Sequence, residues 1–280
     1  MERRPRLSAT NETVQDHGQH HHKDLAHHFD TLEQQHDANT LGMWAFLLTE
    51  VLFFGGLFAA YTIYRYKYSA MFEEASNHLD ITLGATNTVI LILSSLTMAL
   101  AVRCSQTGNS LWTGRWLLIT IAFGLMFLGV KYVEWKHDYH IHLMPGKDWS
   151  GKDYWHWQYA KKAKDMETEA HKKGSAEHSL PNRNDVLADN DPSLGVRGIQ
   201  ESQQARLFFL LYFCMTSLHA LHMLVGFVLI GIIAYFAYQG AYSPEYYSPV
   251  ENIGLYWHFV DIVWIFLFPL LYLLGAHMGH

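Results

Sequence analysis

Long apolar blocks alternate with polar stretches along the chain, and each block is long enough to cross a membrane. A helix of about 20 mainly apolar residues spans a bilayer. Five such blocks are present, at residues 41–64, 84–103, 115–135, 206–238 and 253–274. The pattern predicts an all-α integral membrane protein with five transmembrane helices.

Two polar segments interrupt this pattern. Residues 1–40 are rich in histidine, which is typical of a solvated tail, although imidazoles also suit zinc, copper and nickel. Residues 136–204 form a long polar insertion between helices 3 and 4, and so long a connection is usually functional or disordered. The predicted units are the tail (1–40), helices 1–3 (41–135), the extramembrane insertion (136–204) and helices 4–5 (205–280).

The net charge and the cysteine content exclude only a few classes of function. The net charge of -6 lies almost entirely outside the spans and indicates no nucleic-acid partner. Cys104 and Cys214 are far apart, so they offer neither a disulfide framework nor a haem-attachment motif. Basic residues in the tail favour a cytoplasmic N-terminus, and five spans then place the C-terminus in the periplasm.

Glu50 lies near the middle of the first block. A carboxylate at this depth is costly unless it is protonated, paired or facing a polar cavity, so Glu50 is a candidate functional residue. His219 and His222 on another predicted helix are possible partners. Small residues follow Glu50 and would allow a second helix to approach closely. These predicted helix-packing residues are Gly55, Gly56, Ala59 and Ala60.

Other polar residues within the blocks are spaced to share helix faces. His219 and His222 are three residues apart, as are His258 and Asp261. Lys131 and Glu134 have the same spacing near the end of the third block, where they can pair at the membrane edge.

Three interpretations of these polar residues are open. A membrane cytochrome would use His219 or His222 with His258 as haem ligands, although the first two share one face of one helix. A proton-coupled transporter would use intramembrane Glu, His and Asp, but no inverted repeat or broken helix is visible. In an accessory subunit, these groups would bond to one another, to lipid headgroups or to a partner.

Five strings, in order, resemble subunit III of the haem-copper terminal oxidases, the cytochrome c and quinol oxidase complexes. They are TEVLFFGG around Glu50, NTVILILSS from Asn87, EW at Glu134, HALHMLVG from His219 and YWHFVDIVWIFL from Tyr256. The resemblance covers residues 35–139 and 204–275, and five spans resemble the shorter bacterial type of this family.

The resemblance implies a subunit of the bacterial inner membrane with no cofactor of its own. Haem and copper would reside in subunit I, where oxygen is reduced with proton translocation, and subunit II would complete the complex. Subunit III of this family packs on subunit I, holds structural phospholipid in a helix cleft and supports proton uptake. On this basis Glu50, His219, His222, His258 and Asp261 are expected to form the polar set of the lipid cleft.

Two features depart from the family. Phe236 stands where many members have a cation that contacts lipid phosphate. The insertion at 136–204 exceeds the short connection typical of the family. Its aromatic residues are of the kind enriched in interface cores, so we expect it to contact a periplasmic electron donor or another respiratory complex.

Overall fold

Helices account for nearly all of the structure, a computed structural model that describes residues 29, 31–77, 79–140 and 192–273. For residue 140 and residues 192–202 it describes the backbone alone. The helices are α1 (Leu32–Lys67), α2 (Ser69–Ser76), α3 (Ile81–Gln106), α4 (Ser110–His140), α7 (Pro192–Tyr238) and α8 (Ser248–Tyr272). All except α2 are long and apolar enough to span a membrane, which confirms the predicted all-α fold with five transmembrane helices.

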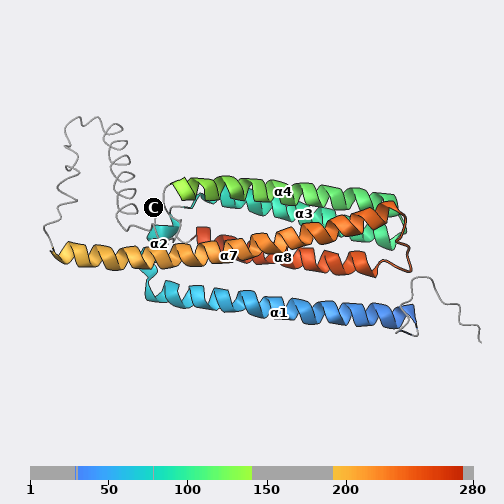
Figure 1. Ribbon diagram of the computed structural model, residues 1–280, viewed down its shortest axis with the longest axis horizontal. Helices are drawn as coiled ribbons and strands as arrows, with labels where there is room; N and C mark the ends of the chain where they lie inside the picture. The colour runs from blue at the N-terminus through green and yellow to red at the C-terminus, as the bar shows by residue number, and fades with distance from the viewer. Residues whose placement is uncertain (1–28, 30, 78, 141–191, 274–280) are drawn as a thin grey trace, which may run out of the picture.

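The five long helices run side by side in alternating directions (Figure 1). The pair α3 and α4 lies on one side of the bundle, α7 and α8 lie in the middle, and α1 lies on the other side (Figure 1). The start of α1, the α3–α4 turn and the α7–α8 connection share one end, called here the α1-start end. The opposite end holds α2 and the last turns of α4 and α8 (Figure 1).

Burial within the chain differs sharply between α8 and α1. Half of the most apolar window of α8 is buried against the rest of the chain, but only 11% of that of α1 is. Gly226 of α7 lets the central helices approach closely, since a Cβ there would lie 2.7 Å from the ring of Trp257. By contrast, α1 touches its neighbours mainly along one stripe, on which Leu47, Phe54 and Tyr61 are buried. Most of its surface is therefore available to lipid or to another protein.

Helix ends extend beyond the apolar blocks because polar groups cap them. The Thr31 hydroxyl accepts a 3.2 Å hydrogen bond from the Gln34 amide, so α1 begins within the segment expected to be a tail. Asp80 caps α3 in the same way. The backbone of α7 likewise begins at Pro192, inside the predicted insertion. The rest of the insertion, 141–191, and residues 1–28 of the tail lie outside the described residues.

The short helix α2 was not predicted from the sequence. It buries Met71, Phe72 and Ala75 and packs against α7. Its Ser76 hydroxyl donates a 2.7 Å hydrogen bond to the carbonyl of Leu271, in the last turn of α8. Tyr61 donates to the neighbouring carbonyl of Leu270 at 2.9 Å. These bonds satisfy carbonyls that a helix end leaves without partners, and they join α1, α2 and α8 at one end of the bundle.

Candidate functional site

Glu50 of α1 and His222 of α7 form a polar contact between helices near the middle of α1. The Oε2 atom of Glu50 lies 3.1 Å from Nε2 of His222, and the two side chains are 20% and 16% exposed. The other ring nitrogen, Nδ1, lies 2.8 Å from the carbonyl of Leu218 and must donate to it, because a carbonyl only accepts. Nε2 is therefore the ring nitrogen that faces Glu50, and the contact joins α1 to α7.

Aromatic residues hold His222 in place. The Phe54 ring lies 5.2 Å from the imidazole, between centroids, and the hydroxyl of Tyr256 donates a 2.9 Å hydrogen bond to the His222 carbonyl. Glu50 thus meets one of the two histidines that the sequence offered as partners.

His219 has different neighbours from His222. Its ring lies between Phe127 and Trp264, with centroid distances of 5.5 and 5.3 Å, and the residue is 1% exposed. Neither ring nitrogen has a hydrogen-bond partner among the described residues. The two histidines therefore do not act as one pair, because His219 faces α4 and α8 while His222 faces α1.

His258 and Asp261 lie on the side of α8 that meets α3. Nδ1 of His258 lies 2.7 Å from the hydroxyl of Ser95. Asp261 is 3% exposed, and neither carboxyl oxygen has a hydrogen-bond partner in the described part of the chain. Two tryptophans of α8 also donate to hydroxyls of α3: Trp257 to Ser94 at 3.0 Å and Trp264 to Thr88 at 3.2 Å. Polar bonds thus connect α3 and α8 at several levels.

Lys131 and Glu134 belong to a closed hydrogen-bond network, called here the Lys131 cluster, with Tyr212 of α7 and Tyr272 of α8. The Lys131 ammonium donates to Glu134 Oε2 at 2.9 Å and to the hydroxyls of Tyr212 and Tyr272 at 3.1 and 2.7 Å. Those hydroxyls donate in turn to Glu134 Oε1 at 3.0 and 2.6 Å. The charged pair is 3% and 4% exposed. The expected pair therefore forms, and it is enclosed by three helices.

Asp138 lies one helical turn beyond Glu134 and is also buried, at 3% exposure. Its Oδ2 atom has no hydrogen-bond partner within the described residues. Asp138, Tyr212 and Tyr272 were not predicted from the sequence. Spacing along α4 carried a signal for Asp138, seven residues from Lys131, but the tyrosines come from other helices and gave none.

The predicted helix-packing residues lie on the outer side of α1. Gly55, Gly56 and Ala59 are exposed, and Ala60 is partly exposed. A Cβ at Gly55 or Gly56 would meet no described atom within 4 Å. No described helix of this chain uses the close approach that these residues allow, so their packing role remains a prediction about a helix of another protein.

Apart from the Lys131 cluster, the polar groups of the spans lie at separate places in the bundle. Among the described residues, no three His, Cys, Asp or Glu side chains are placed to hold a metal ion. His222 is occupied by Glu50 and Leu218, and His258 by Ser95. What the arrangement provides is a set of hydrogen bonds that join helices, beside buried polar atoms of His219, Asp261 and Asp138 that have no hydrogen-bond partner among the described residues.

An apolar groove lies beside the Glu50–His222 contact. It has a volume of about 410 Å³ and is formed by α1, α7 and the first turns of α8. Met43, Phe46 and Leu229 contribute to its walls, and His222 and Tyr256 reach it from the protein side. Within a membrane-spanning bundle, such a groove suits a hydrocarbon chain.

The fold and the site define a multi-pass helical membrane protein in which several polar side chains form hydrogen bonds between the helices. The sequence profile of cytochrome c oxidase subunit III matches residues 203–276, which include most of α7 and all of α8. Cytochrome c oxidase subunit 3 of Synechocystis sp. is 27% identical over 269 residues, covering 96% of this chain and 84% of that relative. Both similarities support the subunit III family of the haem-copper oxidases as the family that this chain resembles.

Relatives carry names from several kinds of oxidase. The cytochrome bo(3) ubiquinol oxidase subunit 3 of Pseudomonas putida is 24% identical over 84% of this chain and 86% of its own length. The haem-copper oxidase subunit I+III of Aeropyrum pernix is 25% identical over 82% of this chain, which corresponds to 22% of that longer protein. Similarity to these subunits therefore does not by itself specify the electron donor.

Proposed function

We propose that this chain is the non-catalytic subunit III of an aerobic respiratory oxidase of the cytochrome c type. The observation that carries the proposal is the similarity to subunit 3 proteins over nearly the whole chain. Oxygen reduction, coupled to proton translocation, takes place at the haem and copper of subunit I. This chain supports that reaction by stabilising the complex and sustaining proton uptake.

The partner in the membrane is subunit I, with subunit II completing the complex. A relative whose name combines subunits I and III supports this pairing. On this chain, the exposed outer side of α1 is suited to the contact, since Gly55, Gly56 and Ala59 leave room for a neighbouring helix backbone.

Phospholipid occupies the groove between α1, α7 and α8. The groove is apolar and lies within the spans, so an acyl chain is the natural occupant. The contact between Glu50 and His222 at its side gives each of these titratable groups a partner, which lowers the cost of placing them next to hydrocarbon. His219 and His258 contact neighbouring helices, and neither they nor Asp261 line this groove.

The chain resides in the bacterial inner membrane with the N-terminus in the cytoplasm. The α1-start end then faces the cytoplasm, and the insertion at 136–204 and the C-terminus face the periplasm. The insertion is placed to meet an electron donor or a neighbouring respiratory complex there.

A quinol oxidase subunit III is the second candidate, favoured by the similarity to the Pseudomonas putida ubiquinol oxidase subunit. The two candidates differ in the electron donor of the complex. An oxidation assay of the purified enzyme distinguishes them directly. Oxidation of reduced cytochrome c supports the first candidate, and oxidation of a quinol with no activity toward cytochrome c supports the second.

Depleting this chain from the purified complex tests its supporting role. We expect the first turnovers of oxygen consumption to proceed, and later ones to slow or stop as proton uptake falls behind. Restoring the full-length chain should restore sustained activity. Identical oxygen-consumption traces with and without the chain would contradict the proposal.

A further inference from the structure

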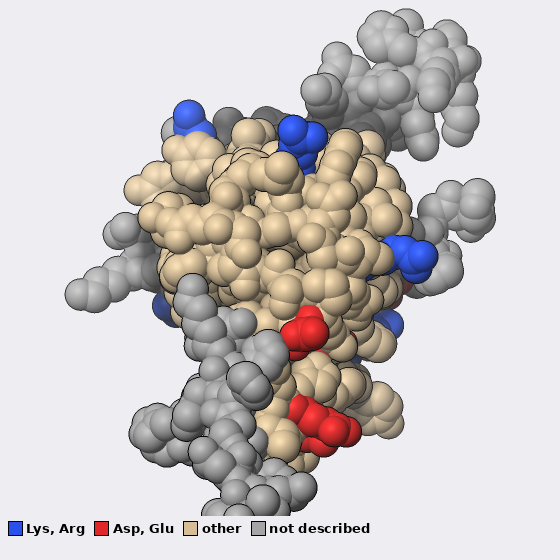
Figure 2. Space-filling view, turned by 90° about the vertical axis from the view of Figure 1, so that its right-hand side faces the viewer, with Lys and Arg blue, Asp and Glu red and all other residues tan. Residues whose placement is uncertain are grey.

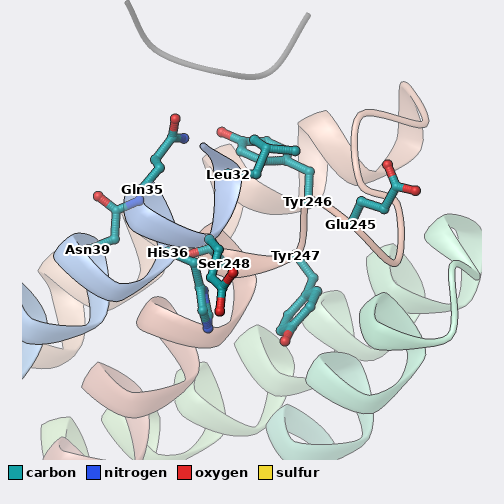
Figure 3. Close-up of a pocket in the computed structure, with 9 residues that line it drawn as sticks. Leu32, Gln35, His36, Asn39, Glu245, Tyr246, Tyr247 and Ser248 are labelled. Carbon is teal, nitrogen blue, oxygen red and sulfur yellow. The ribbon is translucent and has the colours of Figure 1, made fainter. Parts of the chain in front are cut away.

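A polar hollow lies at the α1-start end, between the first turns of α1 and the start of α8. It has a volume of about 170 Å³, and residues 245–248 contribute to its walls (Figure 3). In Figure 3, Gln35, His36 and Asn39 come from α1, and Tyr247 lies across from them. This space is called here the polar hollow. It is smaller than the roughly 300–1,000 Å³ of ordinary ligand pockets, so it suits a single side chain.

The helices around the polar hollow carry carboxylates and no basic residue at this end. Glu33 lines the hollow, Asp37 follows one turn later on α1, and Glu251 lies in the first turn of α8. No Lys or Arg occurs in residues 24–64 or 207–280. Figure 2 shows the acidic side chains of this end close together on the side of α1, with the basic ones on other parts of the face. No Lys or Arg of α1 or α8 therefore balances the negative charge here.

Ser248 lacks a partner inside the polar hollow. It is 7% exposed, it lines the hollow, and its hydroxyl has no hydrogen-bond partner among the described residues. Figure 3 shows Ser248 beside His36, between α1 and Tyr247. A buried hydroxyl without a partner is costly, so a donor that enters the hollow would stabilise this end of the protein.

The kinds of group around the polar hollow suit a guanidinium better than an ammonium. Tyr247 lines the hollow beside Glu33 and Ser248, and its ring is only partly buried. A guanidinium stacks on aromatic rings and donates several hydrogen bonds in one plane, whereas an ammonium is a compact and strongly hydrated charge. A carboxylate, an accepting hydroxyl and an aromatic ring together match an arginine side chain.

Helix dipoles give a simpler reason for two of the carboxylates. Glu33 and Glu251 lie in the first turns of their helices, where negative charge is favourable. That role requires neither a hollow between the helices nor an unpartnered hydroxyl in its wall. Asp37 lies in the second turn of α1, where the dipole acts weakly. The dipoles thus explain part of the charge and leave the hollow unexplained.

The start of the same chain carries the charge that this face lacks. Residues 1–7 read MERRPRL, with three arginines and one carboxylate: Arg3, Arg4, Arg6 and Glu2. The helix α1 begins at Leu32, which lines the hollow, so the N-terminal segment joins the protein at this place. A connection of about 25 residues extends to about 80 Å at most, so segment 1–7 can reach the hollow. The encounter is intramolecular, which favours it over a partner in solution.

We propose that segment 1–7 docks on this face and places one of its three guanidinium groups in the polar hollow. That guanidinium donates to Ser248 and to the Glu33 carboxylate and stacks on Tyr247, and the other arginines lie near Asp37 and Glu251. Because α1 is the least buried span within the chain, the docked segment acts as a strap that joins its start to α8. The inference concerns this chain alone and goes beyond the proposed oxidase role.

Photo-cross-linking of the full-length chain in native membranes tests the docking. A photoreactive amino acid replaces Leu7, and mass spectrometry maps the cross-linked peptides. We expect products within this chain, joined to the first turns of α1 or to residues 245–248. The same probe in place of Val14, further along the tail, is the control and should give a lower yield at these residues.

Charge exchange tests the pairing. Reversing the three arginines together (Arg3→Glu, Arg4→Glu and Arg6→Glu) should lower the yield from Leu7 roughly three- to tenfold, the range that two exposed ion pairs supply. Glu33→Arg with Glu251→Arg should lower it similarly, and combining both sets should restore it. Lys23→Glu, which changes a basic residue outside the segment, should leave the yield unchanged.

Thermal unfolding shows whether each variant is folded, and Glu33→Gln with Glu251→Gln replaces the reversed pair if that pair is not. A folded combined exchange that fails to restore the yield would overturn the pairing.

Ser248→Ala separates entry into the polar hollow from attraction to its rim. It should lower the yield about two- to tenfold, as the loss of one hydrogen bond predicts, and an unchanged yield would overturn entry into the hollow. Cross-links from Leu7 mainly to another protein would show that this face belongs to a partner and would overturn the strap. Equal yields from Leu7 and Val14 would show that segment 1–7 does not dock.

Discussion

The ammonium of Lys131 on α4 lies 2.7 Å from the hydroxyl of Tyr272 on α8, 141 residues further along the chain. Glu134 accepts from the same hydroxyl at 2.6 Å, so the phenol bridges the two charges. Each donor of the Lys131 cluster meets an acceptor, and such closed networks fix how buried helices pack. The cluster thereby joins the last turns of α4 and α8 to the start of the transmembrane part of α7.

Removing one charge of the Lys131 cluster should lower the stability of the protein more than removing both charges. Lys131→Met leaves the Glu134 carboxylate buried without its cation, and we expect a loss of about 3–5 kcal/mol in the free energy of unfolding. The double variant Lys131→Met with Glu134→Leu should lose much less than the sum of the two single variants. Unfolding in detergent, measured as a double-mutant cycle, checks this. Additive losses would show that the two residues are not coupled.

Substitutions at Glu50 should separate hydrogen bonding from charge. Glu50→Gln keeps a donor for Nε2 of His222, so stability should change little. Glu50→Ala leaves that nitrogen without a partner, and we expect a loss of about 1–3 kcal/mol. Thermal unfolding of the two variants beside the wild type makes the comparison. Equal losses for Gln and Ala would mean that the hydrogen bond seen between Glu50 and His222 contributes nothing.

Much of the fold, but less of the site, was predictable from the sequence. The apolar blocks predicted all five spans, because a bilayer requires long runs of apolar residues. The helix α2 was missed because it is short, and its burial of Phe72 depends on α7, which is distant in the sequence.

Side-chain partners depended on how the helices are rotated about their axes. The sequence identified Glu50 as unusual, but it could not choose between His219 and His222. Lys131 and Glu134 were found because they share a helix, whereas Tyr212 and Tyr272 reach them from two other helices. Contacts within one helix follow from spacing, and contacts between helices follow only from the packed structure.

Substitution by alanine should change the stability of the protein in opposite directions at two glycines with different surroundings. Gly226→Ala places a Cβ 2.7 Å from the Trp257 ring, and overpacking should cost about 1–3 kcal/mol of stability. Gly55→Ala meets no described atom within 4 Å and improves helix propensity, so the isolated chain should be as stable or slightly more stable. Unfolding temperatures of the isolated variants test this.

The same outer side of α1 should matter for assembly. Gly55→Leu is expected to leave the isolated chain folded and to reduce its recovery with subunit I, because the larger side chain keeps a neighbouring helix away. Ile63→Leu, an exposed apolar exchange on the same helix, serves as the control and should assemble normally. Normal recovery of the Gly55→Leu chain would place the contact with subunit I elsewhere.

The insertion at 136–204 should contact another protein on the periplasmic side. We expect cross-links between its lysines and a neighbouring protein in intact membranes, and loss of those cross-links when the segment is shortened. The inference rests on its clustered Trp and Tyr residues. Cross-links confined to this chain, together with normal assembly after proteolytic trimming of the segment, would rule out that role.

Co-purification tests the central claim most directly. The full-length chain is isolated from native membranes in mild detergent, and the subunits, haem and copper of the preparation are measured together. We predict a complex in which haem and copper accompany a larger subunit, and in which this chain, once separated, shows no haem absorption. Isolation of the chain without such a subunit, or stoichiometric haem bands from the separated chain itself, would contradict its assignment as a non-catalytic oxidase subunit.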